Sequence, residues 1–279
     1  MIERFAEAAI DGEKLGQRNA TDLLTVSFSS NDYIGHKVGP DAPEVRDMAI
    51  RVDAQLGKFF DLIDRKIGLQ NTIIVLTADH GVSSTPAFNR EHQMPGTYVS
   101  AGATDIVRKA LNSRFGAADW IEFGNNEGIY LNWKTVDEFR SKNGGHVDLS
   151  EIYNTAEQAI LSAPELHAVR VYNREELEAG IAGDFIAQSF MYGFFPRDSA
   201  DLEIVYEPGA ILGAGSGTTH FSPYGYDSHV PVLFMGPRIR PGRYAQRIAP
   251  NDIAPTLASM LDIETPSGSS GSVLTEILQ

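Results

Sequence analysis

The chain has 279 residues, of which 42% are hydrophobic and 22% are charged, and its formal net charge is −14. This charge repels nucleic acid and no Lys/Arg-rich stripe offsets it, so we exclude a nucleic-acid partner. No apolar run approaches the roughly 18 residues that cross a bilayer, which excludes a membrane partner. The absence of cysteine excludes disulfides and thiolate ligands, so His, Asp or Glu must hold any bound metal.

The first hundred residues alternate between helical and strand patterns. We predict helices over 2–16 and 43–67, strands over 22–28 and 71–78, and polar loops over 29–42 and 79–98. Residues 1–16 are charged throughout, which fits an amphipathic helix rather than a signal peptide. The run Ile73–Leu76 is apolar and β-branched, which indicates a strand buried on both faces. This alternation predicts an α/β fold whose mostly parallel sheet is flanked by helical crossovers.

The middle of the chain has shorter elements of mixed type. Helices are predicted near 103–114, 135–142 and 148–162, and strands near 119–123, 127–133 and 166–171. We interpret 99–200 as an inserted mixed α+β cap subdomain, and 1–98 together with 201–279 as the core. The end of the chain returns to the first style, with strands predicted at 202–206 and 230–235 and a helix at 251–262.

Asp32 and His36 follow the first predicted strand. A carboxylate and an imidazole four residues apart can converge on one cation when they lie in a turn or a short helix. The alternative is a polar loop in which Asp32 only caps a turn.

Asp79 and His80 follow the second predicted strand, where open α/β sheets bind their ligands. Adjacent side chains point in different directions, so the pair can serve two metal ions or share one. The alternative is a helix-capping aspartate beside a surface histidine.

The loop 213–231 brings two further histidines, His220 and His229. Its Gly, Ser and Thr residues permit close backbone approach, although a lone loop histidine is commonly only solvated. Asp252 lies beside a helix start and fits helix-dipole stabilisation, while His92, His146 and His167 are interpreted as surface residues.

Together, the Asp/His clusters form a nitrogen and oxygen ligand set that suits zinc, with manganese as a substitute. Two such ions roughly 4 Å apart clamp the attacking and leaving oxygens of a phosphoryl transfer.

Several motifs in chain order resemble the alkaline phosphatase superfamily. They are SFSSNDYIGHKVGPDAPEV, RVDAQLGKFFDLID, IIVLTADHGVSSTP, GTTHFSPYGYDSHVPVLFMGPRIRPG and NDIAPTLASML. The nearest branch is the bacterial single-chain, zinc-dependent alkaline phosphatases related to nucleotide pyrophosphatase/phosphodiesterases. The resemblance covers 20–98 and 202–279 well and the middle poorly. The order D-x-x-x-H, D-H, H is shared with metal-dependent phosphoglycerate mutases and phosphonoacetate hydrolases.

The resemblance implies a zinc-dependent hydrolase of small-molecule phosphate esters, a phosphomonoesterase with phosphodiesterase activity as a second capacity. Asp32, His36 and His220 would hold one Zn²⁺, and Asp79 and His80 the other, with Mn²⁺ or Mg²⁺ as substitutes. Phe221 follows His220 where the family usually has glycine, so His229 stays open as the alternative ligand. The resemblance also implies a periplasmic or secreted protein.

The resemblance further implies that part of the catalytic machinery lies outside this sequence. The family's Thr or Ser nucleophile and one more aspartate precede the D-x-x-x-H motif by a long stretch, for which there is no room before Asp32. We therefore expect a C-terminal half with no identified nucleophile, in which Ser83, Ser84 and Thr85 are merely close to the D-H pair. Exposed apolar surface and self-association should follow where the missing N-terminal half would pack.

Two other functions stay open. One is a different chemistry of the same superfamily, such as cleavage of phosphodiesters, phosphonates or sulfate esters. The other is a metal-binding or assembly domain without catalytic activity, for which the missing nucleophile argues and the intact ligands do not.

Overall fold

A computed structural model describes the whole chain except Ala101, Asn126, His146 and 214–216. Within the described residues, contacts divide the chain into two compact units. The first unit comprises Met1–Ile34, Pro43–Gly81 and His229–Gln279, and the second comprises Gly35–Ala42 and Val82–Ser228. None of the helices described has both the length and the apolarity needed to cross a bilayer.

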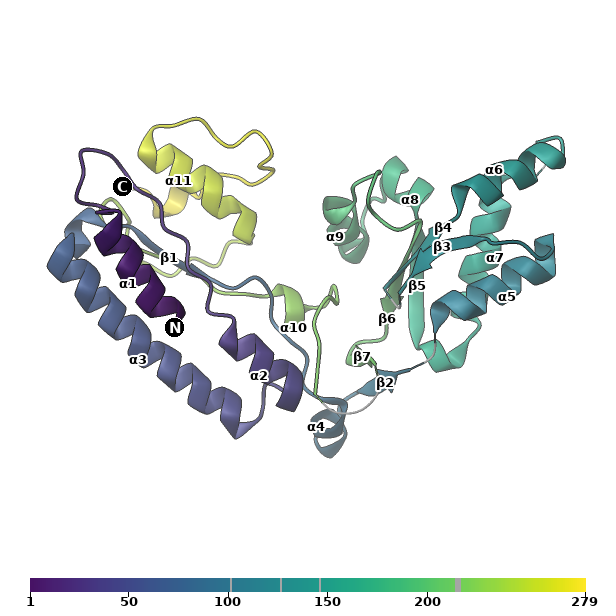
Figure 1. The fold of residues 1–279 in the computed structure, drawn as a ribbon, viewed down its shortest axis with the longest axis horizontal. Coiled ribbons are helices and arrows are strands. Elements are labelled where there is room, and N and C mark those ends of the chain that lie inside the picture. The colour runs from purple at the N-terminus through teal and green to yellow at the C-terminus, as the bar shows by residue number, and fades with distance from the viewer. Residues whose placement is uncertain (101, 126, 146, 214–216) are drawn as a thin grey trace. The chain divides into compact units, whose positions relative to one another are not determined.

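The first unit is built mainly of helices around a short strand pair (Figure 1). Its elements are α1 (Ile2–Gly12), the start of α2 (Ser30–Val38), α3 (Pro43–Lys66), η1 (Leu69–Asn71), β1 (Ile74–Thr77), β8 (Val232–Met235), η3 (Pro250–Asp252), α11 (Ile253–Leu261) and η4 (Thr275–Ile277). Ala6 and Ile10 of α1 form a small core with Phe59 and Ile63 of α3. This core joins helices that are far apart in the sequence.

Helix α3 follows the predicted boundaries closely. Pro43 occupies its first turn, where the missing N–H costs no hydrogen bond. Gly68 ends it with a φ of 89°, and the Gly68 N–H donates to the carbonyl of Ile63 at 3.1 Å. The prediction of a helix over 43–67 with a glycine cap is confirmed.

The strands of the first unit differ from the prediction. Among the described strands β1 pairs with β8 alone, and the pairing is antiparallel, with Ile74 opposite Met235 and Thr77 opposite Val232. β1 is not buried on both faces, because Leu76 keeps 39% of its surface exposed. The predicted strand over 22–28 is wrong: these residues have no strand partner among the described residues, and Leu23 is exposed.

The second unit contains a larger sheet with helices on both of its faces (Figure 1). Its elements are the end of α2, α4 (Pro86–Glu91), β2 (Thr97–Val99), α5 (Ala103–Phe115), β3 (Ile121–Gly124), β4 (Gly128–Leu131), α6 (Trp133–Lys142), α7 (Leu149–Leu161), η2 (Pro164–Leu166), β5 (Ala168–Asn173), α8 (Arg174–Ala179), α9 (Phe185–Gly193), β6 (Leu202–Tyr206), β7 (Ala210–Leu212) and α10 (Gly225–Ser228). The strand order is β3-β4-β6-β5, and every pair in this sheet is antiparallel.

Side-chain alternation along β6 assigns its residues to two different cores. Leu202 and Ile204 belong to the main core with residues of α5 and α7. Val205 faces the other way and packs with Tyr172 and Ala187 in a second core beneath α9. The sheet is therefore covered on both faces, which leaves Glu203 on the face of the second core.

Only one described strand pair is parallel: β2 with β7, in which Tyr98 lies opposite Ile211. The expected predominance of parallel pairing is therefore absent from the described strands. The unit boundaries also place 82–98 and 201–228 with the middle of the chain. An inserted subdomain over 99–200 stays a prediction.

Candidate metal centre

The short helix α2 positions the first two candidate ligands. Asp32 lies in its first turn and His36 in its last. Residues four apart lie on the same face of an α-helix, one turn above the other. The helix therefore points a carboxylate and an imidazole to the same side, as the D-x-x-x-H spacing predicts.

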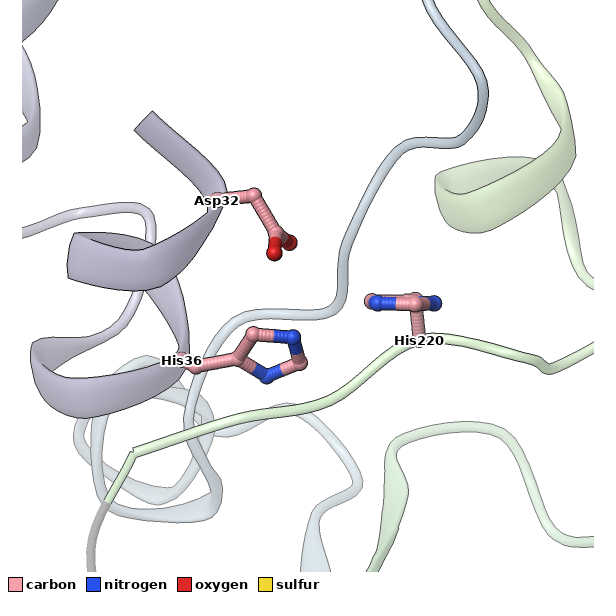
Figure 2. A group of neighbouring side chains, drawn as sticks. All are labelled: Asp32, His36 and His220. Carbon is pink, nitrogen blue, oxygen red and sulfur yellow. The ribbon is translucent and has the colours of Figure 1, made fainter. Parts of the chain in front are cut away.

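His220 lies against this pair. The ring centroids of His36 and His220 are 5.0 Å apart, and each of Asp32, His36 and His220 offers a ligand atom within 4.8 Å of the others. Figure 2 shows the three side chains pointing toward one another. Zinc bonds of about 2.0–2.1 Å place tetrahedral ligand atoms about 3.4 Å apart, so rotation of partly exposed side chains by about 1 Å is enough to fit the ion.

The segment before His220 is fixed to α2 by its backbone. Gly217 has a φ of 89°, and a Cβ atom there would lie 1.9 Å from the carbonyl oxygen of His36. The Thr218 N–H donates to the same oxygen at 3.2 Å, while the Thr218 hydroxyl donates to the Ser83 carbonyl at 2.7 Å. The Tyr98 hydroxyl donates to the Gly217 carbonyl at 3.0 Å. The sequence indicated close approach in this loop but did not identify these supporting residues.

A backbone carbonyl sets the protonation of the His36 ring. His36 Nδ1 lies 2.9 Å from the carbonyl oxygen of Thr218, which can only accept. Nδ1 therefore carries the proton, and Nε2 keeps its lone pair. Such an outer partner orients a metal-binding histidine and fixes its tautomer.

Asp79 and His80 lie just after the end of β1, and His80 lies beside Asp32. His80 Nδ1 lies 2.8 Å from the Gly81 carbonyl oxygen, so Nε2 again keeps the lone pair. That Nε2 lies 3.7 Å from Asp79 Oδ2 and 3.9 Å from Asp32 Oδ1. Asp32 is thus a turn away from His36 on α2 and also adjacent to His80.

The remaining candidates do not join this cluster of side chains. His229 is exposed just after α10, and among the described residues the metal-compatible group contains His220 instead. His92 bonds the Phe88 carbonyl and stacks on the Phe88 ring. His167 contacts Glu207 at 3.1 Å, so its environment does hold a partner. His146 lies outside the described residues.

Asp252 and the hydroxyls near the D-H pair have local structural roles. Asp252 accepts from the N–H groups of Ala249 and Ser272 rather than from the first turn of α11. Ser83 is buried and donates to the Ser84 carbonyl, and Thr85 caps α4 by accepting from the Phe88 N–H. These contacts do not favour either residue as a nucleophile.

Comparison with known proteins places the chain in a family. The sequence profile of the type I phosphodiesterase / nucleotide pyrophosphatase family matches residues 2–227. Alkaline phosphatase PafA of Elizabethkingia meningoseptica is 32% identical over 276 residues, which are 99% of this chain and 49% of that protein. Alkaline phosphatase PhoV of Synechococcus elongatus is 34% identical over 275 residues, 99% of this chain and 48% of that protein.

The fold agrees with these sequence matches. A crystal structure of wild-type alkaline phosphatase PafA matches with a TM-score of 0.90 and 32% identity, covering 99% of this chain and 52% of that chain. The alkaline-phosphatase-like α/β fold and the resemblance to the alkaline phosphatase superfamily are therefore confirmed. The chain spans about half the length of the curated relatives it matches. Since the profile matches most of its residues, the chain belongs to the type I phosphodiesterase / nucleotide pyrophosphatase family.

Proposed function

We propose that this chain supplies the metal-binding part of a zinc-dependent phosphate ester hydrolase of the alkaline phosphatase type. The observation that carries the proposal is the approach of Asp32, His36 and His220 to within ligand distance of one another. The relatives named alkaline phosphatase support the reaction class. The substrate would be a small phosphate ester, and the location periplasmic or secreted.

The donor set fits zinc. One carboxylate and two imidazole nitrogens are three protein ligands, the number that catalytic zinc sites use while a fourth position stays open. Mn²⁺ or Mg²⁺ could substitute, although Mg²⁺ accepts imidazole less readily. Asp79 and His80 would contribute to a second ion, for which this chain offers two ligands and the whole protein would have to offer more.

Zinc bound there would supply Lewis-acid stabilisation of phosphoryl oxygens and a hydroxide-forming water at neutral pH. The chain's own residues prepare the ligands. The Thr218 and Gly81 carbonyls hold the protons of His36 and His80 on Nδ1, so the lone pair through which each ring would bind a metal lies on Nε2. Asp32 supplies the negative charge of the first ligand set.

The nucleophile would come from outside this sequence. Relatives of about twice this length carry the alkaline phosphatase name, and the hydroxyls of Ser83 and Thr85 are engaged in local hydrogen bonds. A Thr or Ser hydroxyl from the rest of the whole protein would therefore attack phosphorus. The isolated chain should bind metal without appreciable turnover.

The direct test combines metal content with a phosphatase assay. Zinc is measured by mass spectrometry in the purified chain and in two matched variants, His220→Ala and His229→Ala. The proposal predicts about one zinc per chain, its loss in His220→Ala and its retention in His229→Ala, with no turnover of p-nitrophenyl phosphate by any of the three. Equal zinc in both variants would contradict the ligand assignment, and real turnover would require a nucleophile within this chain.

A phosphodiesterase is the second candidate, because the matching profile is described by that activity. Rates on monoester, diester and sulfate ester substrates in the whole protein separate these chemistries. A metal-binding domain without catalysis would instead show zinc binding and no turnover even in the whole protein.

A further inference from the structure

The face of the second unit's sheet that carries α9 contains an open pocket of about 260 Å³. Its lining includes three aromatic residues, Phe190 of α9, Phe194 just after α9, and Phe221 of the loop after β7. Glu203 of β6 and Ser222 also line this pocket. The proposed metal centre uses none of these side chains.

Glu203 is an unusual residue for an apolar face. Its neighbours along β6 are buried, and burial raises the pKa of its carboxyl to about 7. A hydrogen bond from the Ala200 backbone acts in the opposite direction, and the Glu127 carboxylate adds a smaller increase. No Lys or Arg among the described residues forms an ion pair with it. Arg174, the cation near Phe194, is bound through Nε to Asp201 at 2.7 Å. A half-buried carboxylate without a protein counter-ion favours a cationic ligand.

Phe221 is held in an unfavourable conformation. Its φ is 86°, in the left-handed region that strains residues with a Cβ atom, and 70% of its surface is exposed. Its ring contacts the His220 ring at a centroid distance of 4.2 Å. A strained backbone that presents an apolar ring to water points to a ligand that covers the ring.

Ser222 adds a polar group that lacks a partner. The Ser222 N–H donates to Asp227 Oδ2 at 2.8 Å, which fixes the backbone at the pocket. The Ser222 hydroxyl is buried and forms no hydrogen bond among the described residues. Buried polar groups are normally paired, so this oxygen is suited to a donor on a bound molecule.

From these features we infer that the pocket binds an alkylammonium ion. The ammonium N–H groups donate to Glu203 and Ser222. The alkyl chain packs against the aromatic rings, and the faces of these rings also attract the charged end of the ligand. The acidic group selects against anions, and the rings select against small hydrated cations such as Na⁺. This inference does not depend on the proposed hydrolase function.

Isothermal titration calorimetry with propylammonium tests the inference on the intact chain, and 1-propanol serves as the neutral analogue. We expect one site for propylammonium and at least about tenfold weaker binding of 1-propanol, the scale of a partly desolvated cation–aromatic and carboxylate contact. Tetramethylammonium, which has no N–H, should also bind more weakly. Equal binding of 1-propanol would overturn the inference, and equal binding of tetramethylammonium would overturn the role of the N–H donors.

Variants separate binding from folding. Glu203→Gln keeps the shape and should weaken propylammonium binding about tenfold, while Glu122→Gln, an exposed carboxylate on β3, should change it less than twofold. Phe221→Gly relieves the backbone strain, so it should stay folded and still bind more weakly. Wild-type affinity in Glu203→Gln, or in Phe221→Gly, would contradict the assigned contacts.

Discussion

The contact of Gly217 with α2 gives the sharpest test of how the metal centre is held. In Gly217→Ala, the new Cβ atom would begin 1.9 Å from the His36 carbonyl oxygen and must retreat about 1.5 Å to reach an ordinary 3.4 Å contact. The alanine would also keep a φ near 89°, which costs about 1–2 kcal/mol. The movement exceeds the roughly 0.5 Å within which a binding constellation must be held.

The expected result is a folded protein with a weakened metal site. Since the substitution displaces the segment that orients His36 and carries His220, zinc affinity should fall about 10–100-fold, as for loss of an outer partner. The free energy of unfolding should fall by about 1–3 kcal/mol. Competition with a chromophoric zinc chelator measures the affinity, and urea unfolding followed by circular dichroism measures the stability.

Gly35→Ala is the matched control. Gly35 lies inside α2, and a Cβ atom there meets nothing within 4 Å. Alanine should therefore raise the unfolding free energy by about 0.5–1 kcal/mol and leave zinc affinity unchanged. If Gly217→Ala bound zinc like the wild type, the close approach of this loop would not set the position of His36, and the reasoning would be refuted.

Three further predictions concern stability and association. Because the pKa of Glu203 is raised from 4.5 to about 7, its ionisation should lower the unfolding free energy as pH rises through this window, by about 1–2 kcal/mol after allowance for its partial exposure. Urea unfolding should show this loss in the wild type and not in Glu203→Gln; an equal pH dependence in both would contradict it. Asp201→Ala leaves the buried Leu131 N–H without its partner and removes the carboxylate bound to Arg174 Nε, while the Pro196 and Ser199 carbonyls still hold the guanidinium, so it should cost about 3 kcal/mol in urea unfolding. The exposed control Asp198→Ala should cost less than about 0.5 kcal/mol. Exposed Leu233 on β8 should promote self-association of the isolated chain, and Leu233→Lys should reduce it in sedimentation velocity; a wild-type monomer at high concentration would argue against this.

Local patterns predicted the boundaries of α3 but not the pairing and burial of the strands of the first unit. The apolar stripe, Pro43 and Gly68 define α3 without help from other parts of the fold. The apolar pattern over 22–28 did not suffice to predict a strand, because a β-strand forms only when a neighbouring strand pairs with it. None of the described strands pairs with these residues. The exposure of Leu76 has the same origin, since burial of a β-strand depends on what packs against both faces.

The predicted loops over 29–42 and 79–98 are wrong where they contain the short helices α2 and α4, and helices α8, α9 and α10 were also missed, although the sequence carries a local signal for α8 and α9. Asn173 and Glu176 form a capping box at the start of α8, a spacing that can be recognised in a sequence. Asp184 caps α9 by accepting from the N–H groups of Ile186 and Ala187. The segment after Asp184 shows no clear helical stripe, because α9 carries apolar rings such as Tyr192 on its exposed side as well.

The candidate ligands on α2 and after β1 could be predicted because their spacing is local. The choice between His220 and His229 could not, because it depends on a contact between residues more than 180 positions apart. The glycine-rich character of the loop predicted close approach, but only the structure identifies Gly217 as the point of contact with His36. Glu203 and its pocket depend on sheet topology and had no signal in the sequence.

The way in which the histidines are oriented also bears on charge. Both Nδ1–H groups face backbone carbonyls, so His36 and His80 would bind as neutral ligands without an added carboxylate partner. A divalent ion held by Asp32 and two neutral imidazoles would keep one unit of positive charge, and an ion beside Asp79 and His80 would likewise keep one before other ligands are added. A chain whose formal charge is −14 would in this way present a locally positive site to a phosphate ester. Carboxylate partners for the same histidines would cancel that charge, which gives a physical reason for the carbonyls found there.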